Sequence, residues 1–145
     1  MKVMNYLLQE RDVLEDDIAV GVSTALSLGE NTRARTWAEQ GLQTYSGSNM
    51  IRPLYITALR LVGDQSQALQ VLQSISDADL RKNPNYQLER AIMYLENEQF
   101  EEALELFEEL IALEEWPDIV SEATDYVDRI HAVQATNSGS SLFPW

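Results

Sequence analysis

A short motif that recurs 34 and then 35 residues apart constrains this chain more than any other feature. Gly29–Ala34 (GENTRA) aligns with Gly63–Ala68 (GDQSQA), and the closing alanine returns at Ala103. Apolar residues at helical spacing flank each motif, which predicts a tight turn between two antiparallel helices. Because one helical hairpin cannot bury its own apolar faces, the repetition predicts a stacked all-α array. We expect Ala68 and Ala103 to be fully buried where helices cross.

The third hairpin, residues 84–117, has the clearest pattern. A polar break at residues 96–99 divides it into two amphipathic segments. Their inward positions are predicted to be Leu88, Ala91, Ile92 and Leu95, then Ala103, Leu104, Phe107, Leu110 and Ile111. Pro53, Pro84 and Pro117 fit the first turns of helices, where a missing N–H group costs little. Asn31 and Asp64 are predicted N-caps for the second helices of the first two hairpins.

This pattern resembles the tetratricopeptide repeat over roughly residues 13–117. The third copy matches best, with Ala91, Tyr94, Phe100, Ala103 and Phe107 at the spacing of that family. The first two copies are weaker, since Asn31 and Gln65 stand where the third has Phe100, and a generic array of helical hairpins remains the alternative. The resemblance implies a right-handed superhelical array of about three hairpins, which we expect to end in a C-terminal capping helix.

The ends of the chain differ from the repeats. Residues 1–11 are predicted to form a short leading helix or arm, and residues 12–135 the repeat domain, opened by a capping box of Asp12 and Glu15. An amphipathic segment after Pro117 is the expected closing helix. Residues 136–145 are predicted to be a flexible tail with an apolar tip. Its side chains Leu142, Phe143 and Trp145 are candidates for docking into the chain's own groove or that of a second copy, so self-association through the tail is one outcome.

Charge and composition narrow the classes of partner. The net charge is −14; residues 1–75 hold eight acidic and six basic residues, a net −2, and residues 76–145 hold sixteen and four, a net −12. Such a chain is poorly suited to nucleic acid or to an anionic membrane surface, whereas a basic protein partner is allowed. No apolar run is long enough for a signal peptide or a membrane span, which predicts a soluble, cytoplasmic protein.

Residues that could carry chemistry are few, and we expect no enzyme activity, metal or cofactor. The chain has no cysteine. Its one histidine, His131, shares a predicted helix face with Asp125 and Asp128, too few converging ligands for a metal. The glutamates of residues 101–109 lie on the predicted outward side of one helix, where a solvated face is favoured over acid–base catalysis.

The resemblance implies binding of a peptide or helix on the concave face, which the first helix of each hairpin would line. The candidate residues face away from the second helices: Ala19, Ser23, Leu26, Ser27, Thr57, Arg60, Leu61, Leu88, Ile92 and Glu96. In particular, we expect Leu88 and Ile92 to be more exposed than Tyr94 or Phe107. The predicted function is an adaptor or scaffold. The alternative is a small acidic chaperone similar to the tetratricopeptide chaperones of type III secretion, which hold aggregation-prone clients.

Overall fold

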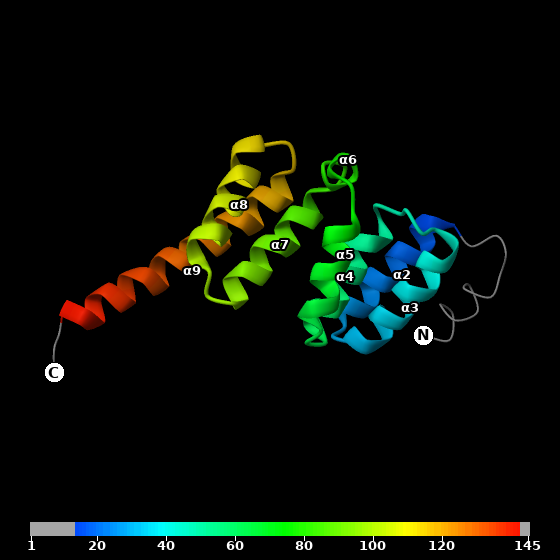
Figure 1. Cartoon of the computed structure of the whole chain (residues 1–145), viewed down its shortest axis with the longest axis horizontal. Coiled ribbons are helices and arrows are strands. Elements are labelled where there is room, and N and C mark those ends of the chain that lie inside the picture. The colour runs from blue at the N-terminus through cyan, green and yellow to red at the C-terminus, as the bar shows by residue number, and fades with distance from the viewer. Residues whose placement is uncertain (1–13, 143–145) are drawn as a thin grey trace. The chain divides into compact units, whose positions relative to one another are not determined.

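The computed structural model describes the backbone of residues 14–142 and the side chains of residues 14–136. This part of the chain is all-helical (Figure 1). The helices are α2 (Glu15–Ser27), α3 (Asn31–Thr44), α4 (Ile51–Leu61), α5 (Gln65–Ser74), α6 (Asp77–Leu80), α7 (Pro84–Glu96), α8 (Phe100–Leu113) and α9 (Pro117–Leu142). The sequence predicted one repeat domain over residues 12–135. By its internal contacts the chain divides into two compact units, the first ending at Asn83 and the second beginning at Pro84.

The first unit is built on a group of three helices. α2 and α3 form a hairpin, α4 contacts both of them, and α5 packs on α4. Trp37 of α3 is buried in the core of this group, together with Ile18 of α2 and Ile51 of α4. Leu26, Leu54 and other half-buried apolar side chains pack around that core. Trp37 therefore packs the first hairpin against α4, the first helix of the second hairpin.

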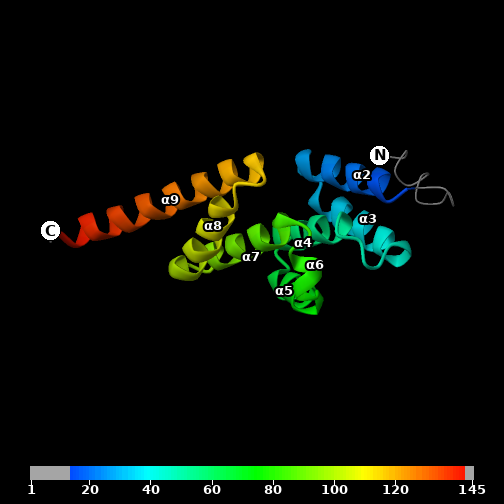
Figure 2. The ribbon, with the colours of Figure 1, turned by 90° about the horizontal axis from the view of Figure 1, so that it is seen from above.

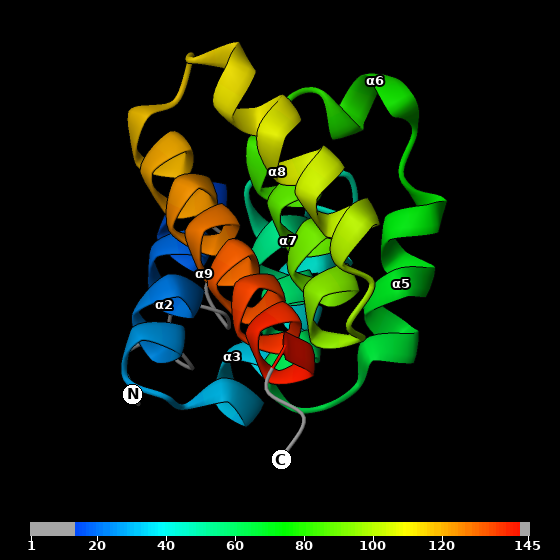
Figure 3. The same ribbon diagram turned by 90° about the vertical axis from the view of Figure 1, so that its left-hand side faces the viewer.

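The second unit contains the third hairpin and its closing helix. α7 and α8 form the hairpin, and α9 contacts both of them (Figure 3). Ala123 and Ile130 of α9 are fully buried in the shared core. The ring of Phe107 stacks on Tyr126, with centroids 5.0 Å apart and planes 12° apart. The predicted packing of the segment after Pro117 against the hairpin is confirmed.

The three hairpins turn in the same way. In the first turn the Gly29 N–H donates to Leu26 O and the Glu30 N–H to Ala25 O, the paired bonds of a Schellman motif. The second and third turns repeat this pair of bonds around Gly63 and Glu98. The residue at the centre of each motif has a positive φ, +76° at Gly29, +87° at Gly63 and +60° at Glu98. The recurring sequence motif is thus a recurring backbone conformation.

The alanine that follows each turn is fully buried. Ala34, Ala68 and Ala103 occupy the first turns of α3, α5 and α8, and none of them retains accessible surface. A side chain no larger than a methyl group lets two helices approach closely at these points. The prediction of buried alanines at the repeat spacing is confirmed.

The predicted helix starts are correct in part. Asp64 caps α5, because its carboxylate accepts the Gln67 N–H at 3.3 Å. Asn31 was predicted to cap α3, but it is the first helical residue, and Glu30 occupies the cap position without a side-chain bond. α2 begins at Glu15 after Leu14, and the predicted cap Asp12 lies outside the described residues. The Glu30 carboxylate instead accepts from Arg33 Nη1 at 3.2 Å.

The last helix is longer than the sequence predicted. A flexible linker was expected from residue 136, yet α9 continues to Leu142, past the ends of α7 and α8 (Figure 2). The Thr136 hydroxyl donates to Ala132 O at 2.8 Å, a bond that holds the side chain along the helix. Residues 1–11, Phe143 and Trp145 lie outside the described residues. The predicted arm and tail docking are therefore not tested.

Candidate partner-binding surface

The ten predicted binding residues differ widely in exposure. Ala19, Leu88 and Ile92 are buried, Leu26, Thr57 and Arg60 are half-buried, and Ser23, Ser27, Leu61 and Glu96 are exposed. The structure thus leaves six of them on the surface of the first unit, three on α2 and three on α4. In the second unit, only Glu96 is exposed.

The prediction that Leu88 and Ile92 face a groove is wrong. Their side chains are only 3% and 4% exposed, whereas Tyr94, the expected core residue, is half-buried. Phe107 is fully buried, as predicted. α7 contacts both α8 and α9, so the side of α7 that carries Leu88 and Ile92 belongs to the core of the second unit.

Six residues on two adjacent helices remain as the candidate surface of the first unit. We call them the α2–α4 surface: Ser23, Leu26, Ser27, Thr57, Arg60 and Leu61. Because α2 and α4 are the first helices of consecutive hairpins and contact each other, their outward residues recur in register. Ser23 pairs with Thr57 in this register, Leu26 with Arg60, and Ser27 with Leu61.

The chemistry of the α2–α4 surface is largely neutral. The Ser27 hydroxyl donates to Ser23 O and the Thr57 hydroxyl to Pro53 O, so both are engaged with the backbone of their own helix. Leu61 has 44% of its surface exposed, and the six residues include no carboxylate. This surface is suited to an apolar or neutral segment rather than to a strongly basic one.

Sequence reasoning did not find a second feature of the first unit, an open pocket at the start of α3. It has a volume of about 550 Å³ and is lined by Gly29, Glu30, Asn31, Thr32, Arg33, Thr36 and Trp37. The Arg33 guanidinium lies 5.9 Å from the centre of the Trp37 ring and 3.2 Å from Glu30 Oε1. The pocket lies at the Schellman turn, and five of its seven lining residues, 29–33, belong to the repeat motif.

A polar bridge joins two helices of the first unit. The Tyr55 hydroxyl of α4 donates to Glu39 Oε1 of α3 at 3.2 Å. Burial raises the pKa of Tyr55 above its usual value of 10.0, and the neighbouring Glu39 carboxylate raises it further. The neutral hydroxyl is therefore the form that the fold favours. Its stabilising effect is present below pH 10 and is lost as the pH rises through the higher pKa of the folded state.

The candidate residues for catalysis or metal binding are exposed on α8 and α9 of the second unit. Asp125, Asp128 and His131 of α9 are all exposed. The glutamates of α8 are exposed as well, as predicted for a solvated face: Glu101, Glu102, Glu105, Glu108 and Glu109. Within the described part of the chain no three acidic or histidine side chains converge as metal ligands would.

Comparison with known proteins does not name a family. No protein-family model matches the chain, and neither a characterised protein nor a solved structure matches it. Among the helices of residues 14–142, none combines the length and the apolar character needed to cross a membrane. The fold and the exposed surface of this chain are therefore the basis for proposing its function.

Proposed function

We propose that this chain is a protein–protein interaction module that binds a peptide or helix of a partner, as an adaptor or scaffold. In this proposal the three hairpins are tetratricopeptide-like units of a right-handed superhelical array, closed by α9. The observation that carries it is the threefold recurrence of one Schellman turn followed by one fully buried alanine. Repeated units of this kind stack their neighbours and leave an extended surface for partners.

The α2–α4 surface is the proposed contact site. It joins two first helices, it carries the exposed Leu61, and the hydroxyl groups of Ser27 and Thr57 are engaged with the backbone of their own helices. An apolar side chain of the partner that covers Leu61 would contribute roughly 25 cal/mol for each Å² of apolar surface removed from water. Several such contacts are needed, so the expected ligand is an extended segment or amphipathic helix that spans α2 and α4.

The test is affinity capture with the whole chain as bait, followed by reconstitution with the purified partner. A bait carrying Leu61→Asp is expected to lose the partner, because a charge would be buried in the contact. The matched control is Leu113→Asp on α8, since Leu113 is similarly exposed, at 51% against 44%. This control bait should retain the partner.

Binding that persists in Leu61→Asp, or that both variants lose equally, would contradict the proposed site. The solubility of the partner separates the two functional alternatives. A partner that is stable alone indicates an adaptor, whereas one that precipitates unless this chain is present indicates a chaperone.

A further inference from the structure

The connection between the two units is fastened to the first of them. It consists of residues 76–83, with α6 at its centre, and Pro84 begins α7. Arg52, in the first turn of α4, donates from Nη2 to Asp79 Oδ2 of α6 at 3.3 Å. Asn83 donates from Nδ2 to Asn49 O at 2.7 Å. These contacts join positions 27 and 34 residues apart in the chain.

Arg52 is held in place by its own surroundings. Its Nη2 also donates to Asn49 Oδ1 at 2.8 Å and to Gly47 O at 3.2 Å, and its Nε donates to Ser48 O at 3.3 Å. Only 14% of its side chain is exposed. A guanidinium fixed by this many acceptors loses little further freedom when a carboxylate binds to it. The loop before α4 is therefore a prepared receptor for Asp79.

The Asp79 carboxylate accepts hydrogen bonds from Lys82 in the connection itself, and from Asn49 and Arg52 at the start of α4. Lys82 Nζ lies 3.2 Å from Asp79 Oδ1, and Asn49 Nδ2 donates to the same oxygen at 3.4 Å. Hydrogen bonds from Lys82, Asn49 and Arg52 hold the pKa of Asp79 below its usual 3.8. The stabilising effect of the ionised form is thus present at neutral pH and is lost as the pH falls below 3.8 toward the lower pKa of the folded state.

The other end of the connection is a break in the backbone. A proline disfavours the helical conformation of the residue before it, and Asn83, before Pro84, is not helical. α6 and α7 are accordingly separate helices. The last fastened residue, Asn83, directly precedes this break, and the boundary between the two compact units falls at the same place.

We infer that residues 76–83 are a latch that moves with the first unit, and that the two units pivot at the Asn83–Pro84 junction. Opening the contacts of Asp79 and Asn83 with the first unit and unwinding α6 would move the pivot back to Ser76 and free an eight-residue tether. Such a tether spans roughly 26–29 Å when fully extended, at 3.3–3.6 Å for each residue. The latch thus sets how far the second unit can travel from the first. This inference is independent of the proposed function.

Amide hydrogen exchange tests whether the latch is closed. The amides of Leu80 and Lys82 donate within the latch, to Ser76 O and Asp79 O. Asp79→Asn and Arg52→Ala should each raise their exchange rates about tenfold, as expected for the loss of one hydrogen bond to a charged group. Arg81→Gln is the matched control, because Arg81 is exposed and donates to Asp77 O within the latch itself. Rates that stay unchanged in both test variants would overturn the latch.

Spin-label distances test where the pivot lies, and the absence of cysteine makes labelling specific. One pair, Gln43→Cys with Ala78→Cys, measures α6 against the first unit. The other, Ala78→Cys with Glu105→Cys, measures α6 against the second unit. We expect the first distribution to be narrower than the second, and to broaden when Asp79→Asn is added. A first distribution as broad as the second, or one that Asp79→Asn leaves unchanged, would place the pivot elsewhere.

Discussion

The two units contain the same group of three helices, packed with side chains of different size at corresponding positions of the middle helix. In each group a hairpin is followed by a third helix that contacts both hairpin helices, α2–α3–α4 in the first unit and α7–α8–α9 in the second. Two buried positions of the middle helix hold small residues in the first group and large ones in the second. Position by position the two cores are therefore not interchangeable.

The buried side of α3 combines one large residue with three small ones, and these are Trp37, Ala34, Ala38 and Gly41. A Cβ added at Gly41 would lie 2.7 Å from Ile18 Cγ2 of α2 and 3.3 Å from Ile51 Cδ1 of α4. At this point of the core, the large side chains thus come from the two outer helices and close over the glycine.

The second group has large residues at two of these positions. Phe107 and Leu110 of α8 stand at the positions that correspond to Ala38 and Gly41 of α3, counted from the buried alanine after each turn. The outer helices of this group provide both small and large buried residues: Leu88, Ala91 and Ile92 of α7, and Ala123 and Ile130 of α9. Because the sum of side-chain volumes constrains a core more than the residue at any one position does, the large residue found at position 107 is not required at the corresponding position 38.

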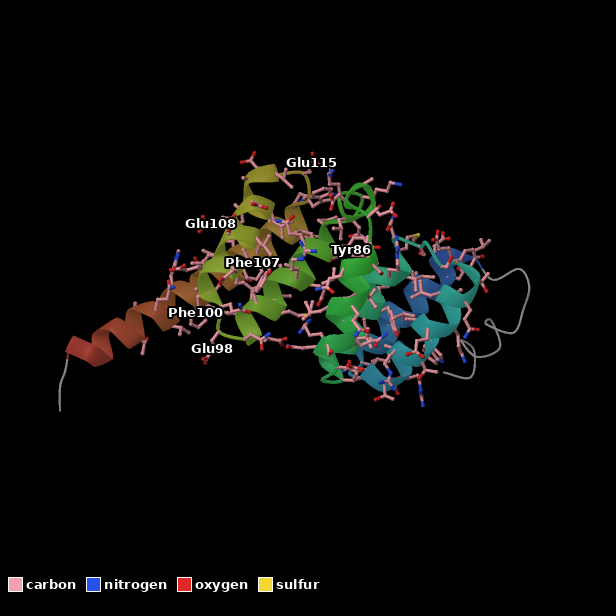
Figure 4. All side chains as sticks on the ribbon, in the orientation of Figure 1. Tyr86, Glu98, Phe100, Phe107, Glu108 and Glu115 are labelled. Carbon is pink, nitrogen blue, oxygen red and sulfur yellow. The ribbon has the colours of Figure 1, made fainter. Side chains whose placement is uncertain are left out.

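The two units also differ in charge. The first, residues 1–83, holds ten acidic and eight basic residues, a net −2; the second, residues 84–145, holds fourteen and two, a net −12. Figure 4 shows Glu98, Glu108 and Glu115 at the outside of the second unit, with Phe107 among its helices. Self-repulsion between surface carboxylates is therefore a property of the second unit, and added salt should stabilise it more than the first.

The largest expected effect on stability comes from Phe107, the large buried residue of α8. Phe107→Ala should lower the free energy of unfolding of the second unit by about 3–5 kcal/mol, because it leaves a cavity under Tyr126. Denaturant unfolding followed by Trp116 fluorescence in a Trp37→Phe, Trp145→Phe background measures this unit. Leu113→Ala is the control, since Leu113 is half exposed, at 51%. Equal effects of the two changes would exclude Phe107 as the centre of this core.

The second prediction concerns Gly41 of α3, where a larger side chain should lower the stability of the first unit by overpacking its core. Gly41→Ala is expected to destabilise the first unit, because forcing a methyl group against Ile18 costs about 1–3 kcal/mol. This exceeds or cancels the roughly 1 kcal/mol of helix propensity that alanine restores. Gly47→Ala is the matched control, with no atom within 4 Å of the added Cβ. Unfolding followed by Trp37 fluorescence reports the result, and a clear gain of stability in Gly41→Ala would refute the close packing.

The turns provide a smaller, two-way comparison. Glu98→Gly should stabilise the second unit by about 1 kcal/mol, because the left-handed conformation is unfavourable for a residue with a Cβ atom. Gly63→Ala should destabilise the first unit by a similar amount, although nothing lies within 4 Å of the added atom. Thermal melts of the two variants should move in opposite directions. Shifts of the same sign would mean that the three turns are not equivalent.

The smallest expected effect concerns charge. Glu105→Lys should stabilise the second unit by about 0.5 kcal/mol at low salt, since it replaces the repulsive pairs at i±3 and i±4 on α8 by attractive ones. The partners in these pairs are Glu101, Glu102, Glu108 and Glu109. The effect should shrink in molar salt. Gln40→Lys on α3 is the control, because its neighbours one turn away, Thr36 and Thr44, are neutral. A gain that persists in high salt would not be electrostatic.

The sequence by itself determined the repeating local structure. Glycine at two of the three turns and alanine after all three predicted both the hairpins and the buried crossings, because positive φ and close helix approach each demand a particular residue type. The helical spacing of residues 119–130 likewise predicted that α9 packs on the third hairpin. Such rules act over a few residues, so they can be read directly from the chain.

Only the tertiary structure decided which sides of the helices are left exposed. α7 is apolar on more than one side, and Leu88 and Ile92 are buried in the core that it shares with α8 and α9. That packing removed two of the predicted binding residues and left the candidate surface on α2 and α4. The Arg52–Asp79 contact was equally hidden, because charged pairs 27 residues apart have no spacing rule. Local sequence patterns determine helices and turns, whereas the burial of a side chain depends on which other helices of the chain pack against it.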